Sequence, residues 1–240
     1  MAELKERMDI NVEELEMRLG AKKLPEFVQE CEKGFINRID SIVEQICSDT
    51  SKRAVFVSGP TSSGKTTFTM RLSEGLKKHG KQASFLSLDD YYISTALKFD
   101  KDGRPDFETI EALDVDRIHK DIVEIIAGNK VIPPLFDFKI RNQVIRPEED
   151  AIELSDNDIL VVEGLHGLSQ RISGGIDDSK CVKVFIMPYG NVFCDTKLMD
   201  MTEIRLLRRI VRDNRHRGAH AIATVDYWPM IEKSEDAYYT

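Results

Sequence analysis

The sequence predicts an α/β protein with a mostly parallel sheet that helices cover on both faces. Short apolar segments alternate with segments of helical periodicity, which is typical of such sheets. The first apolar segment, 54–58, stops at Gly59-Pro60, as a buried strand that ends in a turn would. At 240 residues the chain is long enough for one large domain, or for one domain with an appendage.

The expected elements follow one another along the chain. Strands are predicted over residues 54–58, 83–88, 159–162 and 182–186, and helices over 66–79, 115–127 and 203–214. Gly80 stands where a glycine commonly ends a helix. Residues 1–50 carry apolar side chains at helical spacings. We therefore predict an N-terminal helical extension at 1–50, followed by one domain at 51–240.

The composition excludes several classes of protein. Lys and Arg number 34 against 42 Asp and Glu, which leaves a formal net charge of −8, whereas binders of nucleic acids or anionic membranes carry positive fields. No apolar run approaches the ~20 residues that span a bilayer. The charged N-terminus does not resemble an export signal, and the four cysteines form no C-x-x-C pair. We expect a cytoplasmic protein with neither nucleic acid nor membrane as a partner.

The segment after the first predicted strand fits the phosphate-loop pattern G-x-x-x-x-G-K-[ST]. It reads Gly59-Pro60-Thr61-Ser62-Ser63-Gly64-Lys65-Thr66, followed by Thr67. The N–H groups of such a loop, and the N-terminus of the helix after it, face a phosphate. Lys65 would reach the β- and γ-phosphates, and the Thr66 hydroxyl would bind magnesium. A strand before the motif and a helix after it are the required context, so we predict a P-loop NTPase fold that binds nucleotide through residues 59–67.

Acidic residues follow two more of the predicted strands. Asp89 ends the second strand, where a carboxylate could orient an acceptor hydroxyl and take its proton, although a turn or helix cap would also explain Asp89-Asp90. Glu163 ends the strand at 159–162, as an acid that holds magnesium through water does in P-loop proteins. A guanine-binding N-K-x-D motif is missing, because Asn129-Lys130 is followed by Val-Ile. We predict ATP and Mg²⁺ as cofactors, with Thr66 and Glu163 at the metal.

Arginines gather in one predicted helix. Arg205, Arg208, Arg209 and Arg212 recur at i, i+3, i+4 and i+7, so one helical face carries all four. A solvated face would bring acidic partners at i±4, but only Glu203 and Asp213 are near. Arginine binds phosphate oxygens bidentately, so this face predicts an anion site.

These motifs, taken together and in this order, closely resemble the phosphoribulokinase/uridine kinase family. The resemblance rests on the phosphate loop, Leu88-Asp-Asp-Tyr-Tyr92, Val162-Glu-Gly-Leu-His-Gly167 and the arginines from Arg208 to Arg217-Gly218, and it spans about 54–240. It looks closest to the bacterial-type branch that also has Phe136-Asp-Phe138 and Trp228-Pro229. The resemblance implies an ATP-dependent kinase for a small-molecule hydroxyl, most closely the 5′-OH of uridine or cytidine.

The resemblance also implies roles for single residues. Asp89 matches the catalytic base, acting with Lys65 and Arg212. Acceptor contacts are implied for Asp89, Tyr92, Glu108, Phe136, Phe138 and Arg209. Arg212 and Arg217 would bind the ATP phosphates from a lid at about 205–235. Core packing is an open alternative for the two phenylalanines, and a solvated loop acid for Glu108.

The sequence departs from the nucleoside kinases of the family at two positions. Arg141 stands where they have a base-reading histidine, and is assigned to the acceptor pocket, while Ala219 stands where they have a further arginine. A pentose-phosphate kinase therefore stays open, as does an ATP-binding regulator that transfers nothing. Family members usually continue past the position of Thr240, so a shortened C-terminus is expected. Residues 1–50 would pack on the core or on a second copy of the chain, or would be part of a larger regulatory domain.

Overall fold

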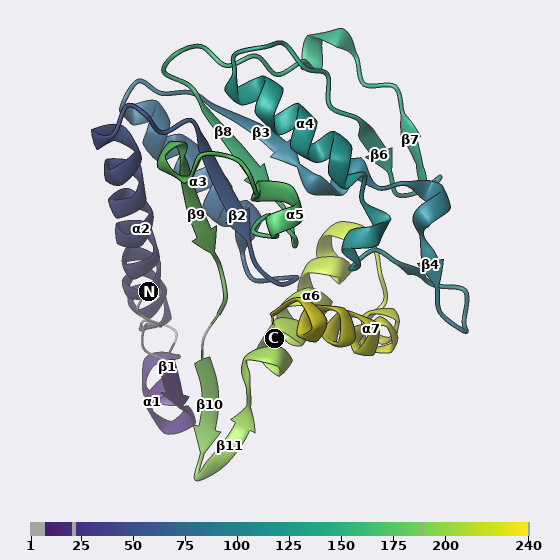
Figure 1. Ribbon diagram of the computed structural model, residues 1–240. Helices are drawn as coiled ribbons and strands as arrows, with labels where there is room; N and C mark the ends of the chain where they lie inside the picture. The colour runs from purple at the N-terminus through teal and green to yellow at the C-terminus, as the bar shows by residue number, and fades with distance from the viewer. Residues whose placement is uncertain (1–7, 21–22, 189, 240) are drawn as a thin grey trace.

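The computed structural model describes residues 8–20, 23–188 and 190–239 (Figure 1). Its main sheet has four parallel strands in the order β3–β8–β2–β9. Their bounds are Ala54–Ser58 (β2), Ala83–Ser87 (β3), Ile159–Glu163 (β8) and Cys181–Phe185 (β9). Each strand lies within one residue of its predicted range, and the α/β fold with a parallel sheet is confirmed.

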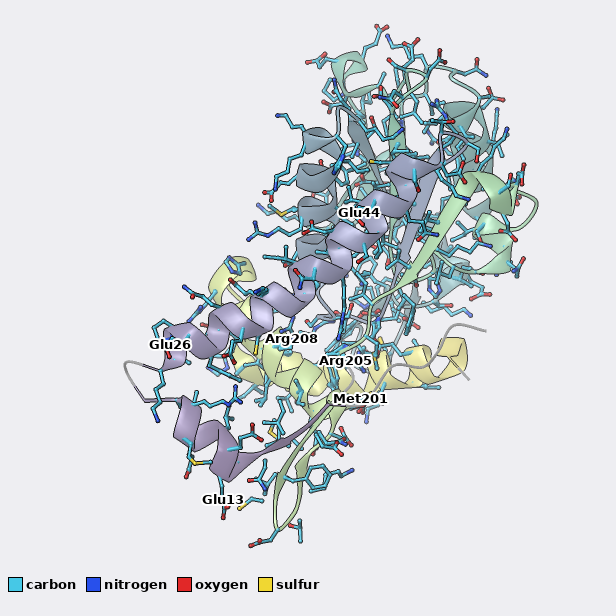
Figure 2. The ribbon with its side chains drawn as sticks, turned by 90° about the vertical axis from the view of Figure 1, so that its left-hand side faces the viewer. Glu13, Glu26, Glu44, Met201, Arg205 and Arg208 are labelled. Atoms are coloured by element: carbon cyan, nitrogen blue, oxygen red, sulfur yellow. The ribbon has the colours of Figure 1, made fainter. Side chains whose placement is uncertain are left out.

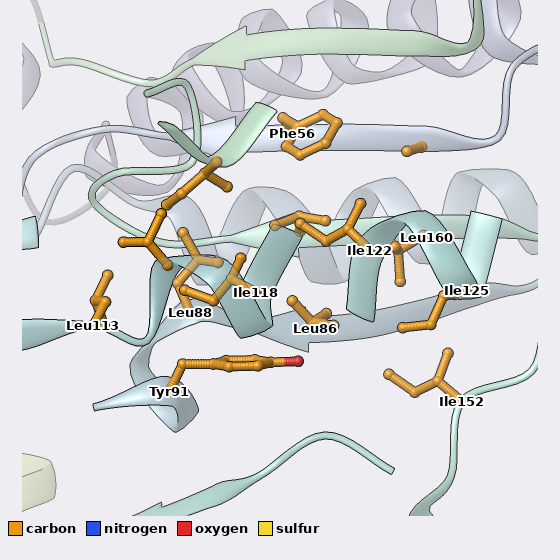
Figure 3. Close-up of a cluster of buried hydrophobic side chains, with 14 of the residues drawn as sticks. Phe56, Leu86, Leu88, Tyr91, Leu113, Ile118, Ile122, Ile125, Ile152 and Leu160 are labelled. Carbon is orange, nitrogen blue, oxygen red and sulfur yellow. The ribbon is translucent and has the colours of Figure 1, made fainter. Parts of the chain in front are cut away.

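Helices cover both faces of this sheet. They are α2 (Leu24–Ser48) and α3 (Lys65–Lys78) on one face, and α4 (Val115–Ile126) and α5 (Gln170–Ser173) on the other. Successive side chains of β2 point to opposite faces of the sheet, as they do in any strand. Phe56 packs with Ile118 of α4 in one core cluster, shown in Figure 3, whereas Val57 packs with Leu72 of α3 in the other.

The contact between α2 and α3 is close. The α2 side chains Ile39, Val43 and Ile46 are buried against α3 and the sheet. At Gly75 of α3, a Cβ atom would lie 2.7 Å from Cγ2 of Val43, so only glycine fits there without a shift. The second half of α2 is therefore built into the core.

The N-terminal segment differs from the helical prediction. Residues Met8–Asn11 form a strand, β1, before the short helix α1 (Val12–Arg18). β1 pairs in parallel with β10 (Gly190–Cys194), which pairs antiparallel with β11 (Thr196–Met199). Strand formation here depends on a partner about 180 residues away, so the local pattern of 1–50 could not indicate it.

Shorter elements complete the described chain. Two small hairpins are β4–β5 (Lys98–Phe99 and Pro105–Asp106) and β6–β7 (Leu135–Asp137 and Asn142–Val144). Turns of 3₁₀ helix lie at Leu88–Tyr91, Ser94–Ala96, Ile110–Ala112, Glu148–Asp150 and Asp178–Lys180. Two helices, α6 (Met201–Arg217) and α7 (Ala221–Tyr239), lie at the end of the sheet toward which β2, β8 and β9 point (Figure 1). None of the described helices is both long and apolar enough to cross a bilayer.

Candidate active site

The phosphate loop connects β2 to α3. At Gly59 a Cβ atom would lie 2.2 Å from the carbonyl oxygen of Ile186, and Gly64 adopts a φ of 109°, so both positions require glycine. The Nζ atom of Lys65 turns back into the loop and donates to the carbonyl oxygens of Gly59, at 2.8 Å, and Pro60, at 3.3 Å. Among the described residues, the buried hydroxyl oxygens of Ser62 and Ser63 have no hydrogen-bond partner. The loop thus has polar groups that are available to an anion.

The parallel register brings the loop next to the predicted acids. Val57 of β2 and Ser87 of β3 both lie opposite Glu163 of β8, so the segments that follow these strands leave the sheet at the same edge. One cavity of about 1070 Å³ opens at this edge, and its lining includes Lys65, Thr66, Asp89 and Glu163. Lys65 Nζ lies 3.8 Å from Oε1 of Glu163. Burial raises the pKa of Glu163, and the nearby Lys65 opposes that shift.

The two aspartates after β3 have different surroundings. Asp89 lines the cavity. Asp90 faces the β6–β7 hairpin, where its Oδ2 atom accepts from Arg146 at 2.6 Å and its Oδ1 atom accepts from the Phe136 amide at 3.5 Å. Asp90 therefore supports the hairpin, whereas Asp89 lies in the cavity lining, where a substrate could meet it.

Four aromatic rings form a cluster beside the cavity. Tyr92, Phe107, Phe136 and Phe138 meet edge to face, with ring centroids 5.0 to 6.1 Å apart. Phe136 is 4% exposed and belongs to the core, while Phe138, Tyr92 and Phe107 line the cavity. The Tyr92 hydroxyl donates to the carbonyl oxygen of Phe107, so the phenol is used within the cluster. The cluster forms an apolar wall of the cavity.

Glu108 and Arg209 lie next to each other in the lining of the same cavity. Glu108 Oε1 lies 3.8 Å from Arg209 Nη1, and Arg209 Nε lies 3.2 Å from Oδ2 of Asp213. Burial raises the pKa of Glu108 to about 7, although Arg209 opposes the shift. The Arg209 guanidinium lies 5.5 Å from the centre of the Tyr227 ring. The positive charge of Arg209 is thus compensated by Glu108 and Asp213, and the polar atoms of the pair could bind hydroxyl groups.

The arginines of α6 contact the phosphate loop directly. Arg208 Nε donates to the carbonyl oxygen of Ser62 at 2.9 Å, and Arg209 Nη1 donates to the Thr61 hydroxyl at 2.8 Å. Arg212 donates to Asp213 at 2.8 Å and lines both the large cavity and a second one of about 550 Å³. The second cavity lies between residues 62–67 and α6. The loop therefore separates two cavities that share Ser62, Lys65, Thr66, Arg212 and His216.

The structure does not bring every predicted acceptor residue to the cavity. Arg141 is exposed on the turn between β6 and β7, with a φ of 53°, and does not line either cavity around the loop. Its assignment rested on alignment with the base-reading histidine of the nucleoside kinases, whereas Lys139 of the same turn lines the cavity instead. The side chain of Arg217, the last residue of α6, lies outside the described part of the chain.

Several residues of this region were not predicted. Thr224, Asp226 and Tyr227 of α7 line the large cavity, together with Arg104 and Pro105. Glu235, also on α7, accepts from the Thr61 amide of the phosphate loop. The Trp228-Pro229 pair was the available signal, because it marks α7 within the motif order, but it does not indicate which side chains of that helix point inward.

The chain is similar to several known kinases. A model of the phosphoribulokinase/uridine kinase family matches residues 55–239. Proteins named uridine kinase from Staphylococcus aureus strains are 24% identical over 184 residues, which cover 76% of this chain and 79% of theirs.

Solved structures share the fold. A protein from Bacillus stearothermophilus that is described as a possible uridine kinase covers 80% of this chain and 90% of its own, with a TM-score of 0.51 and 18% identity. A kinase from Silicibacter assigned to a fructose transport system covers 83% of this chain and 94% of its own, with a TM-score of 0.54 and 14% identity. The match to the family model covers most of the chain. The chain belongs to the phosphoribulokinase/uridine kinase family and is an ATP-dependent kinase.

Proposed function

We propose that this kinase transfers the γ-phosphoryl group of ATP to the 5′-OH of a pyrimidine nucleoside, with Asp89 as the base. The observation that carries the proposal is that Asp89, Lys65 and the Glu108–Arg209 pair line one cavity. Phosphoryl transfer is mainly a matter of placing the acceptor in line and compensating charge, and these groups suit both tasks. The relatives named uridine kinase support the choice of nucleoside.

The phosphate loop would hold ATP. Its phosphates would meet Lys65, the hydroxyl groups of Ser62 and Ser63, and the N-terminus of α3. Arg212 lines both cavities and would contact the transferring group. The nucleoside part of ATP would occupy the smaller cavity beside α6, which leaves the larger cavity for the acceptor.

Thr66 and Glu163 would hold Mg²⁺. A hydroxyl and a carboxylate are oxygen donors of the kind that Mg²⁺ prefers, and both line the cavity next to Lys65. When bound, the ion would supply charge neutralisation on the phosphates. Few protein ligands are needed because phosphate oxygens and water usually complete the octahedron.

Asp89 would act on the acceptor hydroxyl. Its carboxylate would accept the proton as the hydroxyl oxygen forms a bond to the γ-phosphorus, while the bond from that phosphorus to the bridging oxygen of ADP breaks. Glu108 would accept hydrogen bonds from two neighbouring sugar hydroxyls, because a carboxylate has two acceptor oxygens. The aromatic cluster would pack against the apolar part of the acceptor.

A pentose phosphate is the second candidate acceptor. Lys139 and Arg104 add cationic side chains to the lining of the large cavity, and an acceptor phosphate would use such groups. Arg104, however, lies within 3.9 Å of three aspartates, Asp100, Asp102 and Asp226, which already compensate its charge. The nucleoside therefore fits the charge of the cavity better.

The acceptor is tested by ADP release with a panel of acceptors. The panel contains uridine, cytidine, adenosine, ribose 5-phosphate and ribulose 5-phosphate, and the product is identified by phosphorus NMR. Formation of a pyrimidine nucleoside 5′-monophosphate supports the proposal. A sugar bisphosphate as the preferred product overturns it in favour of the second candidate, and a 2′- or 3′-phosphate overturns the assigned hydroxyl.

A further inference from the structure

We propose that Glu235 is a positioning residue of the ATP site, which holds the phosphate loop in its binding conformation through Thr61. The Oε1 atom of Glu235 accepts a hydrogen bond from the Thr61 amide at 2.8 Å, across 174 positions of sequence. Its Oε2 atom lies 2.6 Å from Nη1 of Arg205. Glu235 is 3% exposed and Arg205 is 4% exposed, so the pair is shielded from water.

The phosphate loop contains a residue that needs such support. Ser62 adopts a φ of 58°, in the left-handed region that side chains other than glycine rarely occupy. A residue persists in this conformation only where its surroundings hold it there. Ser62 directly follows Thr61, whose amide is the group bound by Glu235, so the contact fixes the chain at the point where the unusual conformation begins.

Further contacts from α6 hold the same two residues. Arg209 donates to the Thr61 hydroxyl, and Arg208 donates to the carbonyl oxygen of Ser62. Figure 2 shows Arg205 and Arg208 in sequence along α6, beyond Met201 at its start. Arg205 itself packs over the Trp228 ring of α7, with 5.4 Å from its guanidinium carbon to the ring centre. Helices α6 and α7 therefore hold Thr61 and Ser62 from one side, and Glu235 binds the backbone N–H group among these contacts.

Glu235 acts on the ATP site and not on the acceptor site. Glu235 does not line either cavity next to the loop, whereas Ser62 lines both. Loss of the Thr61 contact would let residues 61–62 relax. Ordering the loop would then reduce the free energy gained when ATP binds. The expected effect is a weaker apparent affinity for ATP at unchanged affinity for the acceptor.

The experiment compares two variants, of which only one keeps an acceptor atom for the Thr61 amide. Both carry Arg205→Met, so that no buried cation is left without its partner. One adds Glu235→Gln, whose amide oxygen can still accept from Thr61, and the other adds Glu235→Leu, whose side chain cannot. We expect the KM for ATP to be about tenfold higher in the Leu variant than in the Gln variant, with the acceptor KM and kcat unchanged. Thermal unfolding establishes that both variants are folded.

Three outcomes would overturn the proposal. Equal KM values for ATP would mean that the Thr61 contact does not act on ATP binding. A lower KM in the Leu variant would mean that a polar side chain at position 235 opposes ATP binding instead of supporting it. Parallel changes in the ATP and acceptor constants would mean a general loss of structure. Glu232→Gln, the same type of change one turn earlier in α7, is the matched control and should leave the KM for ATP unchanged.

A second comparison tests whether Ser62 carries the effect. Glycine adopts positive φ without strain, so Ser62→Gly removes the need for external support. We expect the difference in ATP KM between the Gln and Leu variants to shrink to less than threefold when both also carry Ser62→Gly. A difference that stays at its original size would show that Glu235 does not act through the conformation of Ser62.

Discussion

The carboxylate of Glu108 lies 3.8 Å from the guanidinium of Arg209, and yet the pKa of Glu108 is raised to about 7. Burial is the largest cause and favours the neutral acid, while Arg209 favours the anion. Glu235 and Asp89 add negative charge nearby and raise the pKa further. The charge of Glu108 therefore changes close to neutral pH.

This shift makes stability depend on pH. The ordinary pKa of a glutamate is 4.5, so between about pH 4.5 and about pH 7 the folded protein keeps a proton on Glu108 that the unfolded chain releases. Relative to Glu108→Gln, the wild-type free energy of unfolding should fall by up to about 3 kcal/mol as the pH rises through that range, and stay level above it. Urea unfolding of both proteins between about pH 5 and about pH 8 measures the difference. A difference that does not change with pH would contradict the shifted pKa.

Asp89→Asn should abolish most phosphoryl transfer while ATP still binds. The amide keeps the shape of the side chain but cannot take the proton, so kcat should fall about 10²- to 10⁴-fold. Affinity for a non-hydrolysable ATP analogue, measured by calorimetry, should stay within about twofold. Asp90→Asn is the control, because Asp90 binds Arg146 and should affect stability more than kcat. Full activity of the Asp89 variant would remove Asp89 from the proposed role.

Glu163→Gln should raise the requirement for Mg²⁺. Loss of one carboxylate ligand or of its support typically costs 10- to 100-fold in metal affinity. Initial rates at saturating ATP, measured against free Mg²⁺, should therefore give a half-maximal concentration at least about tenfold higher than in the wild type. Superimposable curves for the two proteins would show that Glu163 does not act at the metal.

Gly75→Ala should destabilise the fold through α2. The added methyl group would meet Val43, and overpacking of this kind typically costs about 1 to 3 kcal/mol. Val43→Ala in the same chain should restore part of that loss by making room. Gly34→Ala, on the part of α2 where no atom lies within 4 Å of the new methyl group, should instead stabilise by up to about 1 kcal/mol. Chemical unfolding compares the four proteins, and equal effects of the two glycine substitutions would mean that α2 does not pack on α3.

Local sequence signals were sufficient to predict the strands of the main sheet and the phosphate loop. Strand β2 is apolar up to its last residue, Ser58, and is followed by a Gly-Pro turn. Helix α3 begins at the lysine of a recognisable motif, so both elements could be predicted from neighbouring residues alone. Glu163 could be placed because a single acid ended an otherwise apolar strand. Each of these inferences needs only a few consecutive residues.

The remaining features depend on distant parts of the chain. Strand β1 exists because Met8–Asn11 pairs with β10, and the Thr61–Glu235 hydrogen bond joins the phosphate loop to the last described helix. Arg141 was assigned to the acceptor pocket because it aligns with the base-reading histidine of the nucleoside kinases, but the backbone turns at a φ of 53° and leaves Arg141 exposed. Periodicity does not encode such pairings and turns, because they are set by tertiary packing.

The stacking of Arg205 over Trp228 has a practical consequence. The chain contains a single tryptophan, and its ring is 5% exposed, so all indole emission comes from one shielded position beside the guanidinium that also binds Glu235. Any movement of α6 against α7 changes the environment of that fluorophore. The native protein thus carries an intrinsic, label-free spectroscopic probe, with which nucleotide titrations and rapid-mixing experiments could follow the two helices in real time.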